Sequence, residues 1–210
     1  MARITAKMIN VENATETILE WYALASPDEI ARGSSWYDHA HQYAVALAEK
    51  HDSNLAIAAG VISALSPGTT WERNLLDASA VFTMGDDATV SSYGRNKRKA
   101  LALIDGSIKP DNAFSTAGYK TLQFWRNICS PDVAGPVTID RHCTRAALGS
   151  HLHPNEAIKW SKHARKYERI QSAYQNAADD VGLLPHQLQA VVWLVFRRLF
   201  GRRKAQPIIE

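Results

Sequence analysis

Asp140 and Lys120 are the side chains of this sequence whose type and placement best suit chemistry. Asp140 follows a short extended run, 137–139, and precedes a helix predicted over 141–148, so it is placed to cap that helix. A capping aspartate stabilises a protein by about 0.5–2 kcal/mol and needs no other role. In a cleft, the same carboxylate could stabilise positive charge growing on a sugar, or accept a proton from an attacking nucleophile. Spacing alone favours the cap.

Lys120 stands at the start of another expected helix, two residues after Gly118. Gly118 can adopt the left-handed backbone of a tight turn, and 121–128 continues with helical spacing. To act as a nucleophile, the amine must lose its proton, which requires burial or a neighbouring cation. The alternative role is a fixed positive charge for a DNA phosphate or for a phosphate-bearing leaving group.

The segment 114–148 resembles the helix-hairpin-helix DNA glycosylase superfamily, and within it the endonuclease III-like group. Gly118-Tyr119-Lys120-Thr121 stands where that family has a Gly-x-Lys-Thr-type segment, and Ile139-Asp140-Arg141-His142 where a Val-Asp-x-His segment follows. The resemblance implies that Lys120 matches the lysine some members use as an amine nucleophile. It implies that Asp140 matches the aspartate that nearly all of them need. The sequence departs from the family at Thr116, where the hairpin usually has a glycine.

The resemblance also implies a set of DNA contacts. The turn Ser66-Pro67-Gly68 would enter the gap left by a flipped-out nucleotide, although it also fits a plain helix-ending turn. Backbone N–H groups of the hairpin would hold a phosphate at a helix N-terminus. On the helix after Asp140, side chains three residues apart share one face and suit phosphate contacts or solvation equally. The implied contacts of the hairpin and of that helix are Thr116, Gly118, Tyr119, Thr121, Arg141, His142 and Arg145.

Four further residues are candidates for a substrate pocket. Trp36 and Tyr37 begin a predicted helix and could stack on a base, although core packing is the commoner fate of such aromatic side chains. Gln187 and Trp193 are polar or amphipathic positions on the last predicted helix and could reach the site.

Helices must position all of these residues. Hydrophobic spacing predicts helices over 14–25, 36–50, 54–65, 71–84, 100–104, 121–128, 141–148, 155–160, 167–181 and from Pro185 onward. The helix 54–65 is apolar almost all round and belongs in the centre of a bundle. Only 137–139 suggests a strand. The expected fold class is all-α: a helix-hairpin-helix DNA glycosylase-like bundle of about eight to ten helices in two lobes with a cleft. A single domain spans 1–210, with the hairpin and catalytic segment at about 112–149.

Composition limits the function further. The chain has 210 residues, 46% hydrophobic and 21% charged, as in an ordinary globular protein. The N-terminus lacks a signal-type apolar core and no apolar run approaches a membrane span, so a cytoplasmic protein without a membrane partner is expected, in the host cytoplasm if phage-encoded. Two thiols, Cys129 and Cys143, cannot supply the four ligands of an iron–sulfur cluster. No metal or other cofactor is expected.

The net charge is only +3, but basic residues gather at 95–99, 159–169 and 197–204. Such clusters suit binding to a nucleic-acid phosphate backbone, or exposure of a helix face to solvent.

Three functions fit these observations. The chain is most similar to bacteriophage members of the superfamily implicated in thymine hypermodification, such as amino acid:DNA transferases or thymine pyrophosphorylase-like proteins. That resemblance implies transfer of a free amino acid onto the activated 5-methylene group of a modified thymine in double-stranded DNA. The alternatives are a DNA glycosylase and a non-catalytic DNA-binding protein.

Overall fold

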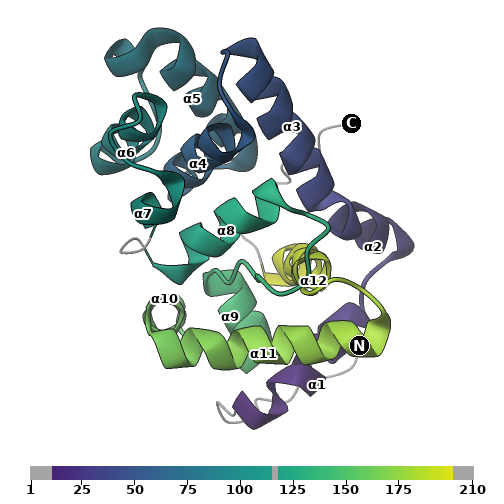
Figure 1. Cartoon of the computed structure of the whole chain (residues 1–210). Helices are drawn as coiled ribbons and strands as arrows, with labels where there is room; N and C mark the ends of the chain where they lie inside the picture. The colour runs from purple at the N-terminus through teal and green to yellow at the C-terminus, as the bar shows by residue number, and fades with distance from the viewer. Residues whose placement is uncertain (1–10, 115–117, 201–210) are drawn as a thin grey trace. The chain divides into compact units, whose positions relative to one another are not determined.

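The computed structural model describes residues 11–114 and 118–200, which fold into helices alone (Figure 1). This range contains twelve α-helices and two short 3-10 helices. The all-α prediction is confirmed, with more helices than the eight to ten expected, since α2 (Pro27–Ser34) and α7 (Pro110–Phe114) were not anticipated. The suggestion of a strand at 137–139 was wrong. That run is extended, but in the described part of the chain it forms no strand. No helix there combines the length and apolarity needed to cross a bilayer.

The chain divides into two compact units, and each has its own core. We call 36–138 the continuous unit. We call the other the split unit, because it combines the stretch up to Ser35 with the stretch from Ile139 onward. The candidate catalytic residues are divided between them, with Lys120 in the continuous unit and Asp140 in the split unit.

The continuous unit is built around one apolar helix, α4 (Leu55–Leu65). Every residue of α4 from Ala58 to Leu65 is buried, and the helix packs against α3, α5, α6, α7 and α8. The prediction that this helix is central is therefore confirmed. The other helices are α3 (Trp36–Lys50), α5 (Trp71–Met84), η2 (Gly85–Asp87), α6 (Gly94–Ile104), α7 (Pro110–Phe114) and α8 (Tyr119–Cys129).

The split unit surrounds a short helix, α9 (Arg141–Leu148), which begins directly after Asp140. The helices α1, α10, α11 and α12 pack against α9, so most of its side chains are buried. Figure 1 shows α9 beside α10 and α11. The members of this unit are η1 (Val11–Asn13), α1 (Ala14–Tyr22), α2 (Pro27–Ser34), α9, α10 (Pro154–Lys162), α11 (Ala164–Val181) and α12 (Pro185–Phe200).

Side-chain caps fix where several helices begin. Ser26 and Glu29 form a reciprocal capping box at the start of α2, with Pro27 in the first turn. Asn54 accepts a hydrogen bond from the Ile57 amide at the start of α4, and Thr70 caps α5 in the same way. These caps satisfy amide donors that a helix leaves unpaired at its N-terminus.

The helices α2 and α12 approach each other closely at Gly33. A Cβ atom at this position would lie 2.6 Å from the Val191 Cα and 2.5 Å from its Cγ2, so only glycine fits. Nearby, Arg198 Nε donates to Glu29 Oε1 at 2.7 Å. Burial alone would raise the pKa of Glu29, but Arg198 and the Ser26 amide lower it below its ordinary value. This pair therefore stabilises the fold above the carboxyl's unfolded pKa, and the contribution is lost as the pH falls through the lower folded pKa.

Replacing Gly33 with alanine should destabilise the protein, because the new methyl group meets backbone atoms of Val191 that have no room to move. Alanine is intrinsically the better helix former, yet we expect a net loss of about 1–3 kcal/mol in the free energy of unfolding, measured with urea. Gly94→Ala is the matched control, since its Cβ would meet only Arg98 Nη1 at 3.8 Å. Equal stability of the two variants would contradict this account of the contact.

Candidate active site around Asp140

Asp140 is held by three hydrogen-bond donors. Its Oδ1 accepts the backbone amides of His142 at 2.7 Å and Cys143 at 2.9 Å. Its Oδ2 accepts the indole Nε1 of Trp193, on α12, at 3.2 Å. The predicted helix cap is confirmed. These hydrogen bonds hold the carboxylate in a fixed orientation.

Buried aromatic side chains hold the backbone on both sides of Asp140. The Ile139 amide donates to Tyr167 Oη at 3.0 Å, just before the carboxylate. Within α9, the Cys143 carbonyl accepts from Tyr174 Oη at 3.2 Å and the Ala146 carbonyl accepts from Trp21 Nε1 at 2.9 Å. All three aromatic side chains are almost completely buried. The carboxylate is therefore attached to a well-packed helix rather than to a loop.

Next to Asp140, three arginines surround one histidine. We call Arg141, His142, Arg145 and Arg197 the arginine cluster. Arg141 Nε lies 3.4 Å from His142 Nε2. Arg197 lies over the Trp193 ring, with 4.8 Å from the guanidinium carbon to the ring centroid, and Arg145 lies over Phe196 at 5.3 Å. The imidazole packs against the same two rings, at centroid distances of 6.4 and 6.1 Å.

The positive charges of the arginine cluster have no salt-bridge partner in the described residues. Arg145 donates one hydrogen bond to the Ser150 carbonyl, while its Nε is buried without a partner. Burial lowers the pKa of His142 below its ordinary value; Asp140 opposes this, and the three guanidinium charges add to it. The cluster thus has the charge and the free donors to receive an anion.

The two cysteine thiols are poor nucleophiles here. Burial raises the pKa of Cys143 well above its ordinary value, and the charge of Asp140 raises it further. Burial likewise raises the pKa of Cys129 to about 11. Since the thiolate is the reactive form, both side chains suit packing better than nucleophilic chemistry.

The expected hairpin is described only in part, because Thr116 lies outside the described residues. Gly118 has a positive φ of 95°, a backbone conformation that favours glycine, but its ψ of 145° lies outside the left-handed helical region. In the helix that follows, α8, Tyr119 is exposed, Lys120 is half-buried and the Thr121 side chain is buried. Lys120 forms no salt bridge among the described residues.

The turn Ser66-Pro67-Gly68 follows α4 and is held by the segment just before α6. Ser66 Oγ donates to the Ser63 carbonyl, and the Pro67 carbonyl accepts from Ser92 Oγ at 3.1 Å. Gly68 has a φ of 87°, and a Cβ there would lie 3.3 Å from the exposed Tyr93 ring. Tyr93 is an aromatic neighbour of this turn that we did not select from the sequence.

The four residues selected for a substrate pocket fall in different places. Trp36 and Tyr37 join an aromatic cluster in the continuous unit with Trp71 and Phe124, in which Tyr37 is buried and Trp36 half-buried. Gln187 accepts the Leu184 amide at 3.0 Å and so caps α12. Trp193 contacts Asp140 directly, through its indole N–H.

Arg197 is the member of the site that sequence analysis missed. It stood among the basic residues at 197–204, for which a solvated tail was equally plausible. The available signal was its spacing: Trp193, Phe196 and Arg197 lie three and four residues apart and so share one face of α12. Periodicity does not say which neighbouring helix that face meets.

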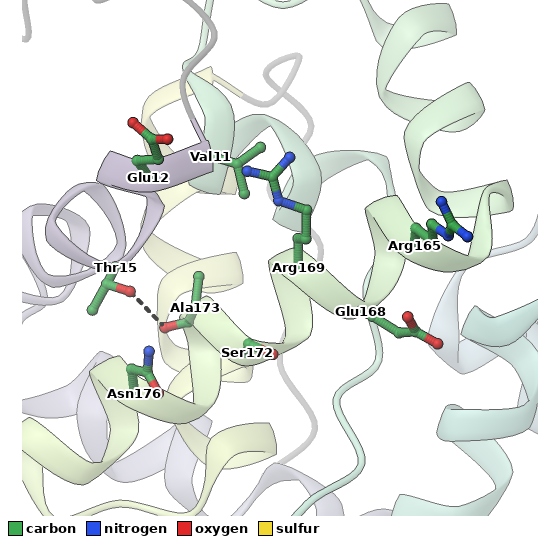
Figure 2. Close-up of a pocket in the computed structure, with 9 residues that line it drawn as sticks. All are labelled: Val11, Glu12, Thr15, Arg165, Glu168, Arg169, Ser172, Ala173 and Asn176. Atoms are coloured by element: carbon green, nitrogen blue, oxygen red, sulfur yellow. Dashed lines mark hydrogen bonds between the residues drawn. The ribbon is translucent and has the colours of Figure 1, made fainter.

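A surface groove on the split unit lies away from these residues. It has a volume of about 520 Å³ and is lined by residues of η1, α1 and α11, including Thr15, Arg165 and Arg169 (Figure 2). None of the candidate site residues lines it. Its mixed charge and open form give it no evident chemistry. Within the described residues, no three His, Cys, Asp or Glu side chains are grouped to hold a metal ion.

Fold and site together define an all-helical protein in which a helix-capping carboxylate lies beside an arginine cluster. The chain belongs to the DUF7178 family, a family of unknown function whose model matches residues 1–200. Comparisons with curated proteins and with solved structures found no significant match. The family thus covers both units and names no substrate.

Replacing Trp193 with phenylalanine removes the donor to Asp140 Oδ2 but keeps a ring beneath Arg197. We expect a loss of about 1 kcal/mol in the free energy of unfolding. Asp140→Asn keeps an acceptor for the helix amides but places an NH₂ group where the indole N–H needs an acceptor. A double-mutant cycle of these two changes should therefore show a coupling of about 1 kcal/mol.

The control is Trp125→Phe, which breaks a separate hydrogen bond to the Ala56 carbonyl. Its effect on stability should be additive with that of Asp140→Asn. If the effects of Trp193→Phe and Asp140→Asn are additive instead, the hydrogen bond between Trp193 and Asp140 is contradicted.

Proposed function

We propose that this protein is a DNA-base-modifying enzyme that acts on a flipped-out base. The reaction is transfer of a free amino acid onto the activated 5-methylene group of a modified thymine. The observation that carries the proposal is the fixed carboxylate of Asp140 directly beside the arginine cluster, which has no salt-bridge partner within 11–114 and 118–200. A site with both charges suits a reaction in which positive charge grows on carbon while an anion departs.

The transfer balances as a displacement at the 5-methylene carbon. The amine nitrogen of the amino acid forms a bond to this carbon, and the bond from carbon to the pyrophosphate oxygen breaks. The bonding electrons leave with pyrophosphate, and the new ammonium group releases one proton to water. Asp140 would stabilise positive charge on the methylene carbon and on the incoming nitrogen, because its oxygens already accept three hydrogen bonds.

A DNA glycosylase is the second candidate, and the same observation supports it. Breaking the bond between base and sugar creates positive charge on the sugar, which a fixed carboxylate stabilises. In a glycosylase, Lys120 would attack the sugar as an amine. In the amino acid transfer, it would contact phosphate as a cation. A non-catalytic DNA-binding protein would need Asp140 only as a cap.

Nucleoside mass spectrometry tests the proposal. Duplexes containing 5-pyrophosphoryloxymethyluracil or damaged bases are incubated with the protein and a mixture of amino acids, then digested to nucleosides. A thymidine-derived nucleoside carrying an amino acid in place of pyrophosphate is the expected product. Release of free base with an abasic site would support the glycosylase instead. Bound but unchanged DNA would overturn both enzymatic proposals.

Asp140→Asn and Asp140→Ser should lower kcat/KM at least about 100-fold while DNA binding, measured by fluorescence anisotropy, is retained. Both replacements are good helix caps, so unfolding should shift by no more than about 1–2 kcal/mol. This pair separates catalysis from capping, because a purely structural Asp140 would leave activity intact in both variants.

Lys120→Ala should abolish borohydride trapping on DNA if Lys120 forms a Schiff base, as the glycosylase candidate allows. Lys120→Arg is the matched variant, because it keeps the charge but forms no Schiff base under these conditions. If Lys120→Arg binds DNA but is not trapped by borohydride, the two roles of Lys120, as a nucleophile and as a phosphate contact, are distinguished. Absence of trapping in the unmutated protein would exclude the nucleophilic role.

A further inference from the structure

We infer that the arginine cluster is a binding site for a phosphate-type oxyanion, and that His142 takes up a proton when the anion binds. The site is formed by Arg141, Arg145 and Arg197, with His142 between them. The inference deepens the proposed function and rests on it for the source of the anion, which is either pyrophosphate or a DNA phosphate. The site itself rests on the geometry of the split unit.

The first argument is unpaired charge. The guanidinium groups of Arg141, Arg145 and Arg197 come from two helices, and no carboxylate forms a salt bridge with them in the described residues. Arg145 keeps a buried Nε–H without an acceptor. Like charges gathered in this way are unfavourable unless an anion neutralises them, and guanidinium groups are the side chains best shaped for phosphate oxygens.

The second argument is preorganisation. Arg197 stacks on Trp193 and Arg145 on Phe196, so two of the three guanidinium groups are already oriented before any ligand arrives. Trp193 is in turn fixed by its bond to Asp140. Little side-chain freedom remains to be lost on binding, which favours affinity.

The third argument is the state of His142. Its Nε2 faces the Arg141 Nε–H at 3.4 Å and so serves as an acceptor in the neutral ring. The charged groups that act on this imidazole are Asp140, Arg141 and Arg145 from α9 and Arg197 from α12. Together with burial, they keep its pKa below the ordinary value, and a bound dianion would offset the three positive charges. The bound state therefore favours the protonated ring, and binding should tighten as the pH falls.

Sulfate is the probe for this coupling, because it remains a dianion across the pH range of the titration. Its binding is followed by NMR of the histidine ring protons of the full chain at pH 6 and pH 8, with chloride at matched ionic strength as the reference. We expect sulfate to shift the His142 signals and to bind at least about fivefold more tightly at pH 6. His142→Gln should remove this pH dependence while retaining affinity at pH 8.

Arg145→Gln and Arg197→Gln should each weaken sulfate binding about tenfold. Arg126→Gln is the matched control, because it removes one exposed positive charge from the continuous unit. Unfolding curves and amide spectra show whether each variant still folds. Absence of a sulfate-specific shift at His142, or an equal effect of Arg126→Gln, would overturn the site. Binding that is the same at pH 6 and pH 8 would overturn the proton coupling.

Two further titrations identify the source of the anion. Pyrophosphate that binds at the cluster together with a short unmodified duplex would indicate a leaving-group site, whereas displacement by the duplex would indicate a backbone phosphate. Either result is compatible with the site. These measurements need no turnover, so a failed transfer assay with intact anion binding would count against the proposed function alone.

Discussion

The hydrogen bonds of Asp140 are the constraint on which the candidate site depends. One oxygen closes the N-terminus of α9 and the other holds Trp193 on α12, so a single carboxylate joins two helices that meet through tertiary packing. The aromatic side chains of α1 and α11 then fix α9 from its other sides. Removing the carboxylate would leave two backbone amides and an indole N–H without this acceptor. The loss of stability would be larger than that from breaking one contact. Structural and chemical roles therefore act through the same atoms.

The positive charges beside Asp140 are tolerated because of where they lie on their helices. Arg145 is in the last turn of α9 and Arg197 in the last turn of α12, where the helix dipole favours a cation. Arg141 is in the first turn of α9, where the dipole opposes it, but the capping carboxylate of Asp140 is its neighbour in sequence. The aromatic rings of Trp193 and Phe196 add cation–π attraction. The helix dipoles and aromatic rings thus offset part of the repulsion among these like charges.

Much of this architecture follows from local sequence, and the exceptions have physical causes. The all-round apolar α4 and the capped α9 could be predicted, because periodicity and caps are local signals. The helix α2 was missed although Ser26, Pro27 and Glu29 form a local start signal; Gly33 weakens the helical pattern, and the need for glycine there arises from Val191, far along the chain. Asp140 was identified through its cap and its family pattern. Its contact with Trp193 and the place of Arg197 depend on how α12 packs on α9, which periodicity does not encode. Gln187 was chosen for its polarity, yet the amide it accepts belongs to its own helix start.

The division into a continuous and a split unit has a consequence for synthesis on the ribosome. All helices of the continuous unit leave the ribosome in one uninterrupted stretch, so its core can form while later residues are still being added. In contrast, α1 and α2 bury their apolar faces against α9, α11 and α12, which are made last. These first helices must wait for most of the chain before they acquire packing partners. The packing of α1 and α2 is therefore completed late, and the carboxylate of Asp140 acquires its indole donor only after Trp193 has been added.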